Sequence, residues 1–183
     1  AGVYVQNDQG RLVLQAGRDI NLTAATVVNQ GKDSLTQLSA GRDMTLSTVT
    51  TSAQDKITWD KNNRLSQGVT QSTGSTLAGN GDVTLTAGRD MTSQAASLSA
   101  QKGLALMAGH DVTLTGAQNT RSLDEYHKVT GSSGILSKTT TTTHDVTDRR
   151  TMTGSELNGD TVSIGAGHNL NVTGSSVAGD NRV

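Results

Sequence analysis

The residues of this chain that could do chemistry are four histidines, one pair of adjacent acids and three Arg-Asp dipeptides. The histidines are His110, His127, His144 and His168. No two of them stand at the spacing of a zinc motif. Asp124 and Glu125 are adjacent, so on a strand their carboxylates would face opposite sides, which is poor geometry for paired acid–base catalysis. Since the chain also lacks a P-loop and a nucleophile motif, it predicts no catalytic residue, no metal site and no cofactor.

The Arg-Asp dipeptides are Arg18-Asp19, Arg42-Asp43 and Arg89-Asp90. Each follows Ala-Gly, which predicts a turn whose Asp bonds nearby backbone while its Arg lies on the surface beside stacked neighbours. His110 and His168 occupy the Arg position of two further copies, which indicates a surface role for them as well. The segment from Gly79 to Leu85 loosely resembles a calcium-binding repeat, but that motif needs tandem nine-residue copies. We therefore expect structural turns without calcium.

These turns belong to a repeated phrase, Ala-Gly-x-Asp/Asn followed by alternating apolar residues. Its copies begin at Ala16, Ala40, Ala87, Ala108 and Ala166. Corresponding apolar residues are 21 positions apart where the repeat is most regular, as in Val83 to Leu104 and Leu85 to Leu106. A period in the low twenties, built from short strand-like pieces and Gly-containing turns, is typical of a solenoid.

The composition agrees with a narrow all-β solenoid. The 183 residues include 21 Gly but no Pro, Cys or Phe. Small turn residues permit a narrow cross-section, and the absence of Pro leaves every strand able to donate hydrogen bonds to a neighbour. Parallel strands joined by crossovers favour right-handed winding. We therefore predict a right-handed parallel β-helix over residues 1–183, with about 20–24 residues per coil.

The repeat is interrupted twice, and both interruptions predict β-hairpins that leave the coil. The first spans residues 53–73 and contains Trp59, and the second spans residues 121–151 and contains Tyr126 and the turn Gly131-Ser132-Ser133-Gly134. Inserts in solenoids often gather on a binding face, so Trp59 and Tyr126 are candidate binding residues. The alternative is that both inserts are tolerated decoration, since inserting loops costs little.

The repeat phrase, the block Ser155–Ile164 and the insert Gly131–His144 together resemble the haemagglutinin repeats of filamentous-haemagglutinin-type exoproteins. The insert is most similar to the second repeat region, which is found in contact-dependent growth inhibition toxins. The resemblance implies a secreted or cell-surface protein of a Gram-negative bacterium. It also implies export through an outer-membrane two-partner secretion transporter, and a β-helical stalk that acts at a target-cell surface or outer membrane.

Three functions remain open from the sequence. The first is a non-catalytic stalk segment that supports adhesion or toxin delivery. The second is a glycan- or receptor-binding module that acts through the hairpins. The third is a polysaccharide-degrading enzyme, but the outward strand positions are mainly Thr, Ser, Asn and Ala, with little that could ionise. A net charge of -1 gives no electrostatic case for nucleic acid. We expect a fragment of a longer protein, because the chain opens at Ala1 without Met. We expect this fragment to be monomeric.

Overall fold

A computed structural model describes residues 2–132, 134 and 137–182, and strands form all of its regular structure. No helix in this part of the chain is long and apolar enough to cross a membrane. The chain forms two compact units. Unit 1 contains the residues up to Val49, Ser72–Ala117 and the residues from Met152, and unit 2 contains Thr50–Gln71 and Gln118–Thr151. The all-β class predicted from the sequence is confirmed.

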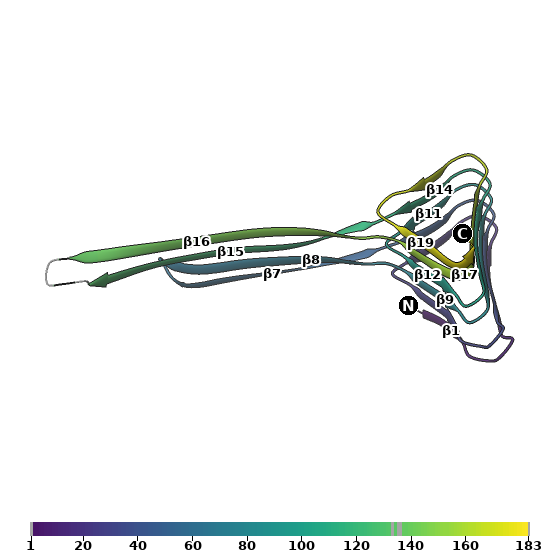
Figure 1. The fold of residues 1–183 in the computed structure, drawn as a ribbon, viewed down its shortest axis with the longest axis horizontal. Coiled ribbons are helices and arrows are strands. Elements are labelled where there is room, and N and C mark those ends of the chain that lie inside the picture. The colour runs from purple at the N-terminus through teal and green to yellow at the C-terminus, as the bar shows by residue number, and fades with distance from the viewer. Residues whose placement is uncertain (1, 133, 135–136, 183) are drawn as a thin grey trace. The chain divides into compact units, whose positions relative to one another are not determined.

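Unit 1 consists of parallel strands in three stacks (Figure 1). The first stack contains β1 (Gly2–Val5), β4 (Thr26–Asn29), β9 (Thr76–Gly79), β12 (Ser97–Ala100), the start of β17 (Glu156–Ala166) and β19 (Ser176–Arg182). The second contains β2 (Arg11–Ala16), β5 (Leu35–Ala40), β10 (Asp82–Ala87), β13 (Gly103–Ala108) and the end of β17. The third contains β3 (Ile20–Thr23), β6 (Met44–Ser47), β11 (Met91–Gln94), β14 (Val112–Thr115) and β18 (Leu170–Val172). The chain visits all three stacks once per repeat.

The register between repeats follows from side-chain alternation. In the second stack Leu38 pairs with Leu85, Leu85 with Leu106, and Leu106 with Ile164. The three leucines are fully buried and belong to one continuous apolar core. Because a one-residue slip would turn these leucines outward, burial of the core fixes the register. The 21-residue spacing predicted from Val83–Leu104 and Leu85–Leu106 is therefore confirmed.

Backbone hydrogen bonds join successive Ala-Gly turns. The amide of Arg42 donates to the carbonyl oxygen of Arg18, and the amide of Arg89 donates to that of Arg42, both at 2.7 Å. A Cβ added at Gly88 would overlap the carbonyl oxygen of Gly41, whereas a Cβ at Gly17 would meet no atom within 4 Å. Glycine is therefore required where the turn packs on the turn of the preceding repeat, as at Gly88, but not at Gly17, where no earlier copy of the turn lies beneath it.

Unit 2 is a four-stranded sheet in the order β16 (Lys138–Thr153), β15 (Ala117–Ser132), β8 (Asn63–Thr73) and β7 (Val49–Asp60). Strands β8 and β15 pair antiparallel, with Tyr126 opposite Arg64 and His127 opposite Asn63. The two inserts thus share one sheet, a pairing that the sequence analysis did not predict. Within the predicted Gly131–Gly134 turn, Ser133 lies outside the described residues, as do Ile135 and Leu136 beyond it.

Candidate functional site

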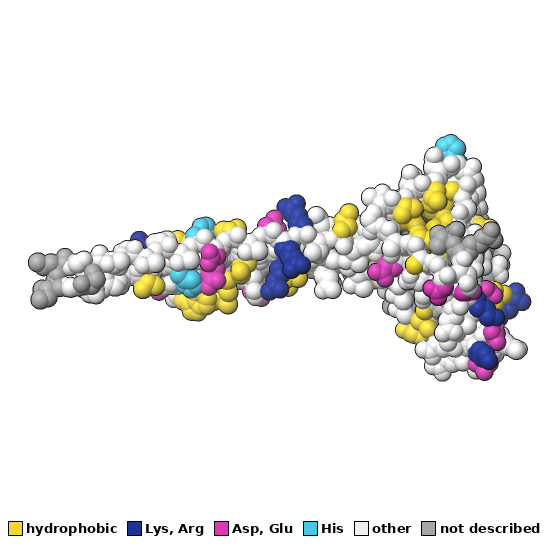
Figure 2. Space-filling view, in the orientation of Figure 1, with side chains coloured by type: hydrophobic (Ala, Val, Ile, Leu, Met, Phe, Trp, Pro, Cys, Tyr) yellow, Lys and Arg dark blue, Asp and Glu magenta, His cyan; other side chains and the backbone are white. Residues whose placement is uncertain are grey.

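The two candidate binding residues lie in unit 2, on different strands of its sheet. Trp59, on β7, is 58% exposed, and Tyr126, on β15, is half-buried. Each contacts a histidine: Trp59 stacks on His127 with ring centroids 6.1 Å apart, and Tyr126 meets His144 edge-on at 5.9 Å. Figure 2 shows histidine and acidic side chains next to one another on this sheet, at the left of the view.

One face of the sheet carries a cluster around His127. His127 Nε2 lies 2.6 Å from Glu125 Oε1, and His127 Nδ1 lies 3.0 Å from Asn63 Oδ1. Each ring nitrogen of His127 therefore faces an oxygen that can accept a hydrogen bond. Trp59 stacks against the same imidazole and shields one side of it from water.

The opposite face carries a second cluster around Tyr126, because neighbours on a strand point to opposite sides. The guanidinium carbon of Arg64 lies 4.4 Å from the centre of the Tyr126 ring, which is cation–π geometry. His144 Nε2 lies 2.9 Å from Asp124 Oδ1. Asp124 thus contacts His144 on one face of the sheet, and Glu125 contacts His127 on the other face. This fits the expectation that the two adjacent acids cannot act as one acid–base pair.

A groove of about 300 Å³ lies elsewhere on the same sheet. It is lined by Val69, Thr70, Gln71, Asn119, Thr120, Arg121, Arg149 and Thr151. Hydroxyl, amide and guanidinium groups are donors that suit hydroxyl-rich or anionic ligands. Sequence analysis missed Arg121 and Arg149 because β15 and β16 bring them together across 28 residues.

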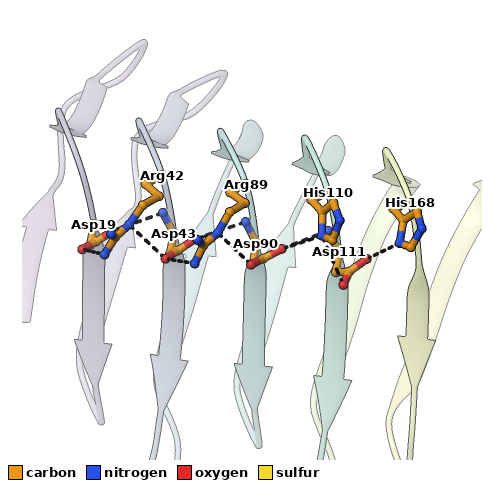
Figure 3. A network of polar contacts seen from close by, with 8 residues as sticks. All are labelled: Asp19, Arg42, Asp43, Arg89, Asp90, His110, Asp111 and His168. Carbon is orange, nitrogen blue, oxygen red and sulfur yellow. Dashed lines mark hydrogen bonds and ion pairs between the residues drawn. The ribbon is translucent and has the colours of Figure 1, made fainter.

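In unit 1 the Arg-Asp turns form a ladder of ion pairs along the third stack (Figure 3). Arg42 donates two hydrogen bonds to Asp19, from Nε at 2.9 Å and from Nη2 at 2.6 Å. Arg89 repeats this bidentate contact with Asp43, at 3.0 and 2.7 Å. Each Asp also accepts a hydrogen bond from the backbone of the next repeat, as Asp19 does from the amide of Asp43. The predicted turn geometry, with each Asp bonded to nearby backbone and each Arg at the surface, is confirmed for Asp19, Asp43, Arg42 and Arg89.

The hydrogen bonds of the ladder shift the pKa values of its charged side chains. The side-chain hydrogen bonds from Arg42 lower the pKa of Asp19 below its ordinary value, and Asp19 in turn raises the pKa of Arg42. Burial acts to raise the pKa of Asp111, but hydrogen bonds from the Asn169 amide and from His168 outweigh burial and lower it. These carboxylates are therefore held in their charged form.

At the other end of the ladder, histidines replace the arginines. The rings of His110 and His168 stack with centroids 4.7 Å apart and an angle of 11° between their planes. Asp111 lies between them, and the ligand atoms of all three residues lie within 4.8 Å of one another. Sequence analysis found no zinc-type spacing because an insert separates the two histidines by 58 residues. Counting positions within each repeat would have placed them on adjacent turns.

The comparisons with known proteins match the whole chain to one family. A hemagglutinin repeat model matches residues 1–127 and again residues 58–183. The chain belongs to the hemagglutinin repeat family. The resemblance inferred from the Ala-Gly phrases and the second insert is thereby confirmed.

This hemagglutinin repeat chain is similar in sequence to two curated relatives. It is 41% identical over 111 residues to the "16S rRNA endonuclease CdiA" of Enterobacter cloacae, a match that covers 60% of the chain. It is 37% identical over 174 residues to the "Deoxyribonuclease CdiA" of Dickeya dadantii, a match that covers 93% of the chain. The matches span only 3% and 5% of the length of these relatives. No solved structure matches the chain.

Proposed function

We propose that this chain is a non-catalytic segment of a large exported protein and serves as part of a rigid stalk. The observation that carries the proposal is the parallel pairing of successive repeats in the three stacks, which joins neighbouring repeats through backbone hydrogen bonds and one apolar core. In such a structure each repeat contacts only its neighbours, so stability adds up repeat by repeat. Length then depends on the number of repeats.

The finer architecture that we propose is a right-handed parallel β-helix over residues 1–183, with two β-hairpins extruded at residues 53–73 and 121–151. Parallel strands recurring about every 21 residues in the regular repeats support the helix, and crossovers between parallel strands favour the right hand. The order β16-β15-β8-β7 supports two hairpins lying side by side.

The proposed setting is the surface of a Gram-negative bacterium or the medium around it. Membership of the hemagglutinin repeat family supports export through an outer-membrane two-partner secretion transporter. The similarity to two CdiA proteins supports a role in delivering a toxin across a target outer membrane, with adhesion as the alternative role of the stalk. The nuclease activities in the relatives' names are not proposed for this segment, since it matches only 3% and 5% of their length.

The stalk proposal is tested in the exported protein that carries this segment. Leu106 is buried in the core and Trp59 is exposed. Leu106→Asp should abolish surface display and activity against target cells, because it places a charge in the apolar core. Trp59→Ala and Tyr126→Ala should leave both unchanged. Loss of activity in the aromatic variants, with display retained, would contradict a purely structural role.

The architecture is tested by small-angle scattering on the chain itself. A compact globule of 183 residues has a radius of gyration of about 16 Å. The proposed β-helix with extruded hairpins should give a clearly larger radius and an asymmetric distance distribution. A value near that of the globule would overturn it.

The second candidate function is binding of a glycan or receptor through unit 2. It is favoured by the exposure of Trp59 and by the groove that contains Arg121 and Arg149. Deleting residues 121–151 should then abolish binding to target cells while the circular-dichroism spectrum stays strand-like. Trp59→Ala and Tyr126→Ala should weaken binding, and Tyr4→Ala, an exposed tyrosine in unit 1, is the matched control. Unchanged binding in both variants would remove this candidate.

A further inference from the structure

The end of the ladder at His110 and His168 differs chemically from the rest of it. Asp19 and Asp43 are each held by bidentate arginines, which are permanently charged and offer no lone pair. Asp111 instead makes its ion pairs with the two histidines. A histidine ring nitrogen can bind a metal ion, whereas a guanidinium cannot.

The distances fit a metal ion of the size of zinc. His110 Nδ1 lies 3.3 Å from Asp111 Oδ2, and His168 Nδ1 lies 3.3 Å from Asp111 Oδ1. Zinc bonds of about 2.0–2.1 Å in a tetrahedron place neighbouring ligand atoms about 3.4 Å apart. The two imidazoles stack nearly parallel on adjacent turns, so their in-plane lone pairs do not yet converge on one point. The ligand atoms of the three residues lie within 4.8 Å of one another, and because both histidine side chains are exposed, rotation of the side chains alone would bring both nitrogens to one ion.

Two further side chains contact the same ring nitrogens. His168 Nδ1 lies 2.6 Å from Asn169 Nδ2, and His110 Nδ1 lies 3.2 Å from Asp90 Oδ1. An ion bound at both Nδ1 atoms would replace these contacts, and the carboxylate of Asp90 adds a further negative charge beside the site.

We propose that His110, Asp111 and His168 form a binding site for a first-row transition-metal ion, represented by Zn²⁺. Two imidazoles and one carboxylate are ligands that zinc accepts, whereas magnesium and calcium prefer oxygen ligands alone. Both histidines are exposed, at 52% and 64% of the side chain, so the ion can enter directly from solvent and water can complete its coordination. The ion would join two neighbouring repeats of unit 1, in place of the arginine found in the earlier turns.

The test is titration of the untagged chain with Zn²⁺ in a calorimeter. One ion should bind per chain, with an increase in melting temperature. The matched variants are His110→Arg and His168→Arg, because arginine already occupies this position in Arg42 and Arg89 and pairs with aspartate there. Each should fold normally and bind Zn²⁺ at least about tenfold more weakly.

The control is the double variant His127→Ala/His144→Ala, which removes the two histidines of unit 2. It should keep one-to-one binding of Zn²⁺ at the unsubstituted affinity. The proposal is overturned if the unsubstituted chain binds no zinc, or if the arginine variants bind it as tightly as the unsubstituted chain. It is also overturned if binding disappears with the unit 2 histidines.

Discussion

Ser93 and Ser155 are 62 residues apart in the sequence, yet their hydroxyl oxygens lie 3.2 Å apart inside unit 1. Ser155 is the second residue after β16, where the chain returns from the second insert. Its hydroxyl lies 3.0 Å from the carbonyl oxygen of Thr115 and 3.2 Å from that of Ser93, so its one proton can be donated to either, and it accepts from the amide of Ala96. Ser75 has the corresponding role after the first insert, where its hydroxyl donates to the carbonyl oxygen of Leu22 and accepts from the amide of Ala25. A buried serine therefore fixes each return to the stacks.

Replacing Ser155 by alanine should destabilise the protein. The change leaves the carbonyl and amide groups around a fully buried position without their partner, so we expect a loss of about 1–3 kcal/mol in the free energy of unfolding. Urea denaturation monitored by circular dichroism measures it. Ser163→Ala, at an exposed position of β17, should change the stability by less than about 0.5 kcal/mol. Equal effects of the two substitutions would show that the buried hydrogen bonds contribute little.

Substitution by alanine should destabilise the protein at one glycine of the Ala-Gly motif and have no effect at another. Gly88→Ala places a Cβ against the carbonyl oxygen of Gly41, whereas Gly17→Ala meets open space. We expect Gly88→Ala to cost about 1–3 kcal/mol through overpacking, and Gly17→Ala to be neutral. Thermal unfolding of both variants measures the difference. If Gly17→Ala were as damaging as Gly88→Ala, backbone flexibility would be the cause instead of contact between repeats.

The two faces of β13 should differ in their sensitivity to truncation. Leu106 is 0% exposed and its neighbour Met107 is 50% exposed. Leu106→Ala should cost about 2–5 kcal/mol, because it removes apolar contacts and leaves a cavity between Leu85 and Ile164. Met107→Ala should cost much less. The denaturation midpoints of the two variants measure this difference in stability. Similar midpoints would mean that Met107 contributes to the core as much as Leu106 does.

The ladder should make stability depend on pH in the acid range. The pKa of Asp19 is lowered from 3.8 in the folded chain, so its stabilising effect is present above that value and is lost as the pH falls through the lower folded pKa. The melting temperature should therefore fall below about pH 4, and high salt should weaken the effect. Asp19→Asn should make this fall less steep than Asp145→Asn, a control at an exposed position of β16. An identical acid profile in the two variants would count against the ladder.

The sequence predicted the register well where the repeat is continuous. Met91 pairs with Val112 at the predicted spacing of 21, and Leu157 pairs with Val177 at the predicted spacing of 20. In such segments a two-residue side-chain period and a regular turn leave one register that buries the apolar residues. The predicted surface position of Arg42 and Arg89 is also confirmed.

The sequence failed where an insert interrupts the repeat. The pairs Leu38–Leu85 and Leu106–Ile164 each cross an insert, so their separations of 47 and 58 residues carry no visible period. The pairing of β8 with β15 was also missed, because polar alternating strands offer no apolar pattern that selects a partner. The proximity of His110 and His168 was not predicted for the same reason. The binding role of Trp59 and Tyr126 stays a prediction.

The order of the four strands in unit 2 ties its two inserts to each other. β7 and β8 come from the first insert, and β15 and β16 come from the second. The two inserts meet where β8 pairs antiparallel with β15, so each insert covers one edge of the other. Because an uncovered strand edge can pair with another chain, removal of either insert alone would expose the other to edge-to-edge association.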